Sequence, residues 1–234
     1  MDNYHRSVTT MGVSYPAGTL VRSGVERATL VRRTYTLVLA SVVFTIGGVA
    51  FAFTQERLMI AVAQHPFLSF IAVLAPLFLA MNRRKSYPAN IGLTLLFTFM
   101  EGIWLAPVLL YYMQMQQGVV GEAAALTLGA FTVLTAYAFV SRRDFSAWGS
   151  FLTVGLFVLL GALILTMFFP SPASQLWLSV IGIMIFSGFV IFDTWRMRNV
   201  YGPDDYVEAA VNIYLDLLNI FLFLLSLFGG NRRS

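Results

Sequence analysis

The chain has 234 residues, of which 58% are hydrophobic and 11% are charged, whereas a soluble domain carries about a quarter charged residues. This composition predicts a membrane protein with several spans. The absence of Cys excludes disulfides and thiolate metal sites, and two His residues are too few for a His-rich site. We expect the net charge of +4 to set the orientation in the membrane rather than to bind nucleic acid.

Residues 1–30 are polar, and they lack the apolar core of a signal peptide, so we expect a flexible cytoplasmic tail. Residues 31–230 form the predicted transmembrane domain, and 231–234 a short C-terminal tail. A membrane-spanning helix needs roughly 20 mostly apolar residues. Seven stretches qualify: 34–53, 60–81, 89–112, 121–140, 149–169, 175–195 and 207–228. Gln64, His65 and Pro66 interrupt the start of the second stretch, and an alternative start lies near Phe67.

The distribution of Lys and Arg predicts the orientation of these spans. With the N-terminus inside, twelve basic residues fall on the inner side and three on the outer side, which are Arg57, Arg232 and Arg233. Basic residues favour the cytoplasmic side of a membrane protein. We therefore expect a cytoplasmic N-terminus and an external C-terminus.

Three carboxylates fall within predicted spans. One of them, Asp216, lies in the last span, close to the middle of the bilayer. A charge at the bilayer centre costs about 2.5–3.5 kcal/mol on insertion scales. Asp216 lies ~15 Å from the cytoplasmic end of its helix, on one face with Asn212 and Asn219. This polar stripe predicts that the last span lies inside the bundle. The simpler alternative is that the three side chains only hydrogen-bond neighbouring helices.

Asp193 lies about one turn from the cytoplasmic end of the preceding span, where an ion pair with Arg196 is the simpler alternative. The two helices are joined by a short loop, so they are antiparallel neighbours and Asp193 can face Asp216. Two close carboxylates do not readily ionise together, and they titrate as a unit. Ca²⁺ also prefers carboxylate oxygens. The pair is therefore a candidate proton switch and a candidate cation site.

Glu101 lies near the middle of the third span, beside Gly102 and before Pro107. It suits either a cavity wall or a protonated acid that is hydrogen-bonded to a neighbouring helix. Arg83 and Arg84 end the second span as an orientation signal, and one of them is also placed to pair with Asp193. The sequence has no Walker loop, GxSxG, HExxH or nucleophile–base set. We therefore expect no enzymatic activity.

The segment IFDTWRMRN, followed by NIYLDLLNIFLFLLSLFG, resembles the signature of the Bax inhibitor one family, also called the transmembrane BAX inhibitor motif family. Further matches are MNRRK, the EGI–LAP stretch and SRRDFS, so the likeness covers roughly residues 30 to 230. It implies an all-α integral membrane protein of seven transmembrane helices, six of them around a central C-terminal helix.

The resemblance also implies a function and roles for particular residues. Asp193 and Asp216 correspond to the family's paired aspartates, which are linked to a pH-dependent Ca²⁺ leak. A basic latch at the end of span 2 is implied, but Asn82 occupies its first position, which leaves Arg83 or Arg84. The likeness suits a bacterial inner-membrane member, with lipid, Ca²⁺ and protons as partners and no tightly bound cofactor.

The leading prediction is a pH-sensitive calcium leak channel, for which one monomer encloses the pathway. The alternatives are a cation/proton exchanger that uses the same carboxylates, and a non-transporting regulator of a membrane AAA protease or stress response. The last role is one to which bacterial relatives have been tied.

Overall fold

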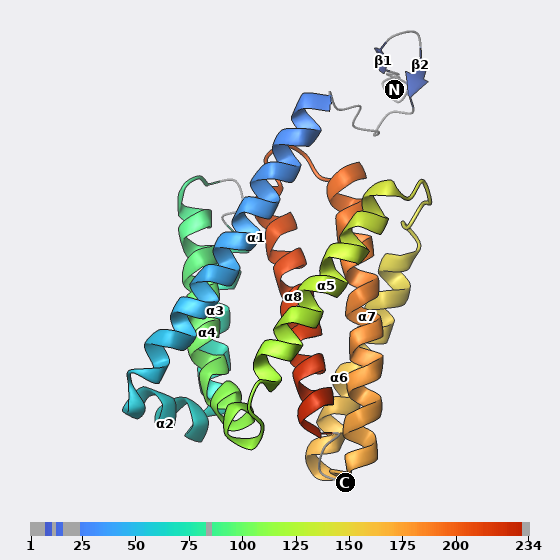
Figure 1. The fold of residues 1–234 in the computed structure, drawn as a ribbon. Helices are drawn as coiled ribbons and strands as arrows, with labels where there is room; N and C mark the ends of the chain where they lie inside the picture. The colour runs from blue at the N-terminus through green and yellow to red at the C-terminus, as the bar shows by residue number, and fades with distance from the viewer. Residues whose placement is uncertain (1–7, 11–12, 16–23, 83–85, 231–234) are drawn as a thin grey trace, which may run out of the picture.

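The computed structural model describes residues 8–10, 13–15, 24–82 and 86–230. Two short strands pair antiparallel ahead of the helices, β1 (Val8–Thr10) and β2 (Val13–Tyr15). Eight helices follow in the described part of the chain (Figure 1): α1 (Gly24–Phe53), α2 (Glu56–Gln64), α3 (Pro66–Asn82), α4 (Ala89–Met115), α5 (Val119–Val140), α6 (Trp148–Phe168), α7 (Pro172–Asn199) and α8 (Tyr206–Gly230).

Six of these helices are long and apolar enough to cross a membrane, and the pair α2 and α3 supplies a seventh candidate with a bend of 104°. The bend lies at His65, immediately before Pro66. Proline disfavours helical geometry in the residue before it, so the helix breaks there. The helix α3 therefore begins at the alternative start predicted near Phe67, and α2 lies across the end of the bundle (Figure 1).

The first helix begins at Gly24, ten residues before the predicted start of the first span and inside the stretch predicted as a tail. Leu30 explains this extension, because it is fully buried in a cluster with Met197 and Ile213 of α7 and α8. Packing against other helices therefore prolongs α1 beyond its apolar stretch.

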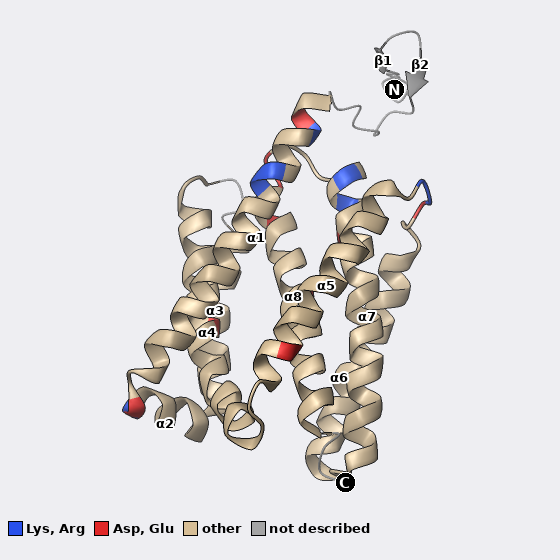
Figure 2. Ribbon diagram, viewed as in Figure 1, with Lys and Arg blue, Asp and Glu red and all other residues tan. Residues whose placement is uncertain are grey.

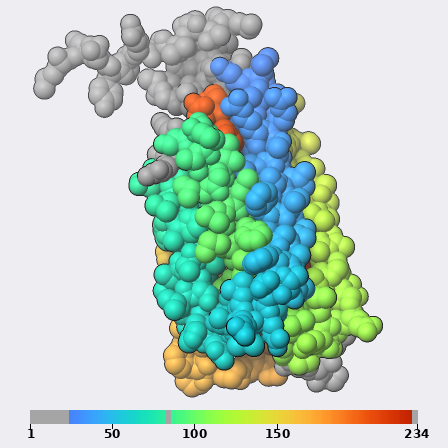
Figure 3. Space-filling view, turned by 90° about the vertical axis from the view of Figure 1, so that its left-hand side faces the viewer, coloured from blue at the N-terminus to red at the C-terminus, as the bar shows by residue number. Residues whose placement is uncertain are grey.

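The last helix, α8, occupies the centre of the bundle, as the resemblance implied. It packs against α1, α4, α5 and α7, while α3 packs on α4 and α6 packs on α7. Half of its most apolar window is buried, a larger share than in the other candidate spans. Figure 3 shows α3, α4 and α1 side by side on one face of the bundle.

The helices α1 and α4 approach each other closely through two glycines. A Cβ atom at Gly48 would overlap the carbonyl oxygen of Phe99, and one at Gly102 would overlap that of Thr45. Only a residue without a side chain allows the two backbones to meet at this distance. The contact fixes α4, which carries Glu101, against α1.

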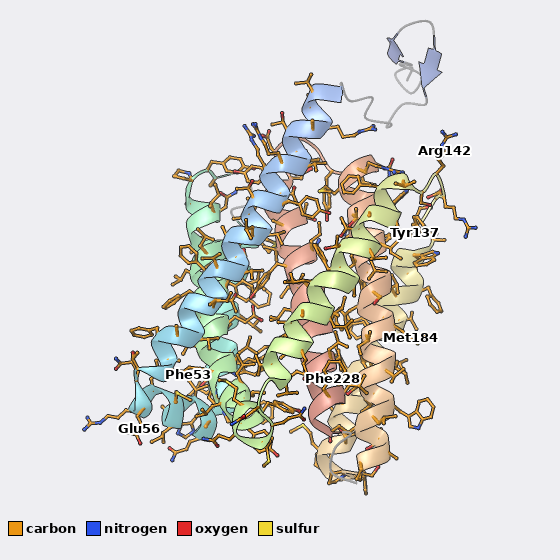
Figure 4. The ribbon with its side chains drawn as sticks, in the orientation of Figure 1. Phe53, Glu56, Tyr137, Arg142, Met184 and Phe228 are labelled. Carbon is orange, nitrogen blue, oxygen red and sulfur yellow. The ribbon has the colours of Figure 1, made fainter. Side chains whose placement is uncertain are left out.

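Lys and Arg gather at the end of the bundle where α1 begins and α7 ends (Figure 2). Arg142 lies at this end, whereas Phe53 and Glu56 mark the opposite end (Figure 4). We name these the basic end and the opposite end. The cytoplasmic location of the basic end remains a prediction from the charge distribution.

Candidate ion site

Asp193 and Asp216 are brought together by the packing of α7 against α8. Each residue is only 5% exposed, and their carboxyl groups interact directly. The oxygen Oδ2 of Asp216 is buried and has no hydrogen-bond partner among the described residues. The predicted proximity of the two aspartates is therefore present in the structure, near the basic end of the bundle.

Among the described residues, the charged partner of this pair is Arg196, which lies one turn after Asp193 on α7. Its Nη1 atom donates a hydrogen bond of 3.1 Å to Oδ1 of Asp193, and its Nη2 atom lies 3.9 Å from Oε1 of Glu208. The guanidinium group also lies 4.8 Å from the ring centroid of Tyr201. The ion pair that the sequence offered as an alternative thus exists alongside the aspartate pair.

The predicted latch residues, Arg83 and Arg84, lie outside the described residues. The sequence interpretation did not include Tyr201 and Glu208, which hold Arg196 in place. The sequence offered only one hint of these contacts, which is that both residues follow Arg196 closely along the chain. Contacts across the turn between two helices cannot be read from spacing alone.

Asn212 belongs to the shell around Arg196. Its Nδ2 atom donates a 3.0 Å hydrogen bond to the hydroxyl of Tyr201, which lies 3.4 Å from Oε1 of Glu208. Tyr201 lies in the turn between α7 and α8, and burial raises the pKa of its hydroxyl. Burial likewise raises the pKa of Tyr87, in the turn before α4, to about 12. Both loop tyrosines therefore stay neutral at physiological pH, and neither can serve as the proton switch.

Asn219 does not join the aspartates. Its Nδ2 atom donates a 2.8 Å hydrogen bond to the carbonyl oxygen of Leu215, four residues earlier on the same helix. The shared helix face was therefore a correct observation about spacing, but the side-chain amide is used within α8.

Glu101 forms a second polar cluster, on the other side of α8. The hydroxyl of Tyr214 donates a 3.1 Å hydrogen bond to Oε2 of Glu101 and lies 2.7 Å from Oγ1 of Thr45. Residues 214 and 216 point in roughly opposite directions, because successive helical residues are ~100° apart. The structure therefore does not bring Glu101 to Asp216. Tyr214 was missed, although it stands two residues before Asp216 in the YLD motif.

Two carboxyl groups are the anionic ligands that this site offers to a cation. Within the described residues, no group of three or more His, Cys, Asp and Glu side chains is arranged to hold a metal ion.

Comparison with known proteins places the chain among relatives of similar length. Residues 27–233 match the sequence model of the family described as Inhibitor of apoptosis-promoting Bax1. The chain is 31% identical to Bax inhibitor 1 of Schizosaccharomyces pombe, over 87% of this chain and 77% of that protein. It is 33% identical to Protein lifeguard 4 of Mus musculus, over 85% of this chain and 84% of that protein.

A bacterial relative matches over a similar extent. The chain is 35% identical to an uncharacterized protein of Neisseria meningitidis serogroup A, over 87% of this chain and 91% of that protein. The family match spans both the aspartate pair and the helices that hold it. The chain therefore belongs to the Bax inhibitor-1 family of multi-pass membrane proteins.

Proposed function

We propose that this protein is a pH-sensitive calcium leak channel of the bacterial inner membrane, with its N-terminus in the cytoplasm. Asp193 and Asp216 are its proton sensor and its transient cation site. The observation that carries the proposal is the contact between these two buried carboxyl groups beside Arg196. A buried ionisable group inside a membrane-spanning bundle marks an ion or proton pathway by default.

The charge balance of the site explains how it can respond to pH. Two ionised carboxylates ~4 Å apart would repel each other by about 4 kcal/mol at an effective dielectric constant of 20. One shared proton removes this repulsion, and Arg196 then balances the remaining charge of the pair. Glu208, 3.9 Å from Arg196, competes with Asp193 for the positively charged guanidinium group of Arg196. In this proposal, the arrangement with Arg196 paired to Asp193 is the closed form, and the aspartate pair holds one proton in that form.

The sign of the pH dependence follows from proton binding. In an open form, water reaches both aspartates and both ionise near neutral pH, so the open form binds one proton fewer than the closed form. Lowering the pH favours the state that binds more protons. We therefore expect low pH to close the pathway, and the leak to rise as the pH rises through the titration of the pair.

Calcium can compete with this closed form. Ca²⁺ takes six to eight oxygen ligands, and carboxylates are among its preferred ones. The ion would displace the shared proton and Arg196, with water supplying its remaining ligands. Arg196 then acts as the latch among the described residues, while a contribution from Arg83 or Arg84 stays a prediction.

The test is Ca²⁺ influx into liposomes that contain the purified protein and an enclosed indicator, between about pH 6 and 8. We expect pH-dependent influx in the parent and no pH dependence in Asp193→Asn or Asp216→Asn. Asp144→Asn is the matched control, because Asp144 is an exposed residue of the α5–α6 loop. If Ca²⁺ influx in both buried variants depended on pH as it does in the parent, the proposal that the two aspartates are the proton sensor would be refuted.

The same vesicles separate the alternatives. Uphill Ca²⁺ movement driven by a proton gradient alone would identify an exchanger, since a leak moves ions only down their gradient. A folded protein with no flux at any pH would point to a non-transporting regulator, for instance of a membrane AAA protease. A monomer that conducts would show that one bundle encloses the pathway.

A further inference from the structure

A pocket of about 580 Å³ lies between α6, α7 and α8 at the opposite end of the bundle, where α7 begins and α8 ends. Hydroxyl and amide groups line it beside apolar side chains. Ser179 donates a 3.1 Å hydrogen bond to Ser226, and Gln175 donates one of 3.3 Å to the same hydroxyl. Among the described residues, the lining of the pocket therefore has no charged side chain, and its polar groups are hydroxyls and one amide set among apolar side chains.

An aromatic contact borders this pocket. Phe223, which lines the pocket, stacks on Phe186 with ring centroids 5.9 Å apart and an interplanar angle of 29°. The ring of Phe223 also occupies the space beside Gly182, where an added Cβ atom would lie 2.6 Å from three of its ring atoms. The glycine thus lets the phenylalanine ring lie flat in the seam between the two helices.

The pocket, the aromatic contact and the aspartates follow one another along this seam. On α7, Ser179, Phe186 and Asp193 are spaced by seven residues, which places them on one helix face ~10 Å apart. On α8, Phe223 stands seven residues after Asp216, on the side of the pocket. The contacts Ser179–Ser226, Phe186–Phe223 and Asp193–Asp216 therefore form successive levels of an antiparallel helix pair.

We propose that this pocket is the outer entrance of the cation pathway, and that Phe223, packed on Gly182 and Phe186, is the hydrophobic barrier between the entrance and the aspartates. Neutral hydroxyl and amide oxygens admit a hydrated cation without holding it tightly. A constriction formed by apolar rings excludes water and so stops ions. The identity of the cation rests on the proposed function, but the barrier does not.

The chain contains no Cys, so single cysteines can report water access without background. The two reporters are Ser226→Cys in the pocket and Asn219→Cys, which lies between Phe223 and Asp216 along α8. Each is introduced into the full chain, reconstituted in lipid nanodiscs, and treated with a positively charged, water-soluble thiol reagent. The labelling rate is measured by mass spectrometry.

We expect Ser226→Cys to react at least about tenfold faster than Asn219→Cys in the otherwise unchanged protein, because the barrier excludes water. Adding Phe223→Ala should remove most of this difference. Phe221→Ala is the matched control, since Phe221 lies on the same helix but lines a different, apolar groove between α1, α4, α5 and α8. It should leave both rates unchanged.

Gly182→Ala provides a second perturbation if Phe223→Ala does not fold. Its methyl group displaces the ring while the ring itself is retained, so Asn219→Cys should again react faster. If Ser226→Cys did not react with the reagent, the proposal that the pocket is the entrance would be overturned. An Asn219→Cys rate that neither variant raises would overturn the barrier. Because labelling requires no Ca²⁺ flux, a failed calcium test refutes the proposed function and leaves this result standing.

Discussion

Replacing Arg196 by glutamine tests whether this arginine holds the closed form. The substitution removes the cation whose Nη1 atom lies 3.1 Å from Oδ1 of Asp193. At an effective dielectric constant of 20, the direct attraction at that distance is about 5 kcal/mol. The side chain of Arg196 is 30% exposed, so water screens part of this attraction, and Glu208 remains as a partner in the open form.

We therefore expect the substitution to destabilise the closed form relative to the open form by about 2 to 3 kcal/mol, as for a charged hydrogen bond of this kind. A difference of 1.4 kcal/mol changes an equilibrium about tenfold, so the ratio of closed to open protein should fall roughly 30- to 140-fold. The Ca²⁺ influx of Arg196→Gln liposomes at neutral pH should rise accordingly, up to the limit set by a fully open population. Without the arginine, closure should also require a lower pH, because a second proton must replace the lost positive charge.

The matched control is Arg198→Gln, two residues further along α7. Arg198 donates hydrogen bonds to the carbonyl oxygens of Phe139 and Ser141 at the end of α5, and it forms no ion pair with a carboxylate of the described residues. Its loss should lower the melting temperature but leave the pH profile of influx unchanged. A folded Arg196→Gln protein with parental influx and parental pH dependence would refute the latch.

Three further predictions concern single positions. Asp216→Asn should make Ca²⁺ influx vary by less than about twofold between pH 6 and 8, because the shared proton is lost; a parental profile would contradict this. Gly48→Ala should destabilise the protein by about 1–3 kcal/mol in thermal unfolding, because its methyl group meets backbone rather than a movable side chain. Gly47→Ala is its control and should be neutral or stabilising by up to ~1 kcal/mol, since its methyl group meets only one ring atom at 4.0 Å; equal melting temperatures would count against the close packing. Tyr214→Phe should cost about 1–3 kcal/mol in the same assay, because Glu101 loses its hydrogen-bond donor, and an unchanged melting temperature would argue against that bond.

Much of the fold could be predicted because bilayer insertion depends on quantities that a sequence displays directly. The length and apolar character of each stretch predicted the helices, and Pro66 marked the break between α2 and α3. The pairing of Asp193 with Asp216 followed from the short loop between their helices, which makes the two helices antiparallel neighbours that can face each other. The resemblance added the central position of α8, which spacing did not show.

The sequence by itself determined which residues are forced into an apolar environment, because hydropathy and helix length are local properties. Tertiary structure alone decided which of those polar residues meet. It turned Asn219 onto its own helix, placed Glu101 with Tyr214 on the far side of α8, and surrounded Arg196 with Tyr201 and Glu208. Helix rotation and side-chain direction depend on packing against neighbouring helices, and no spacing along one helix contains that information.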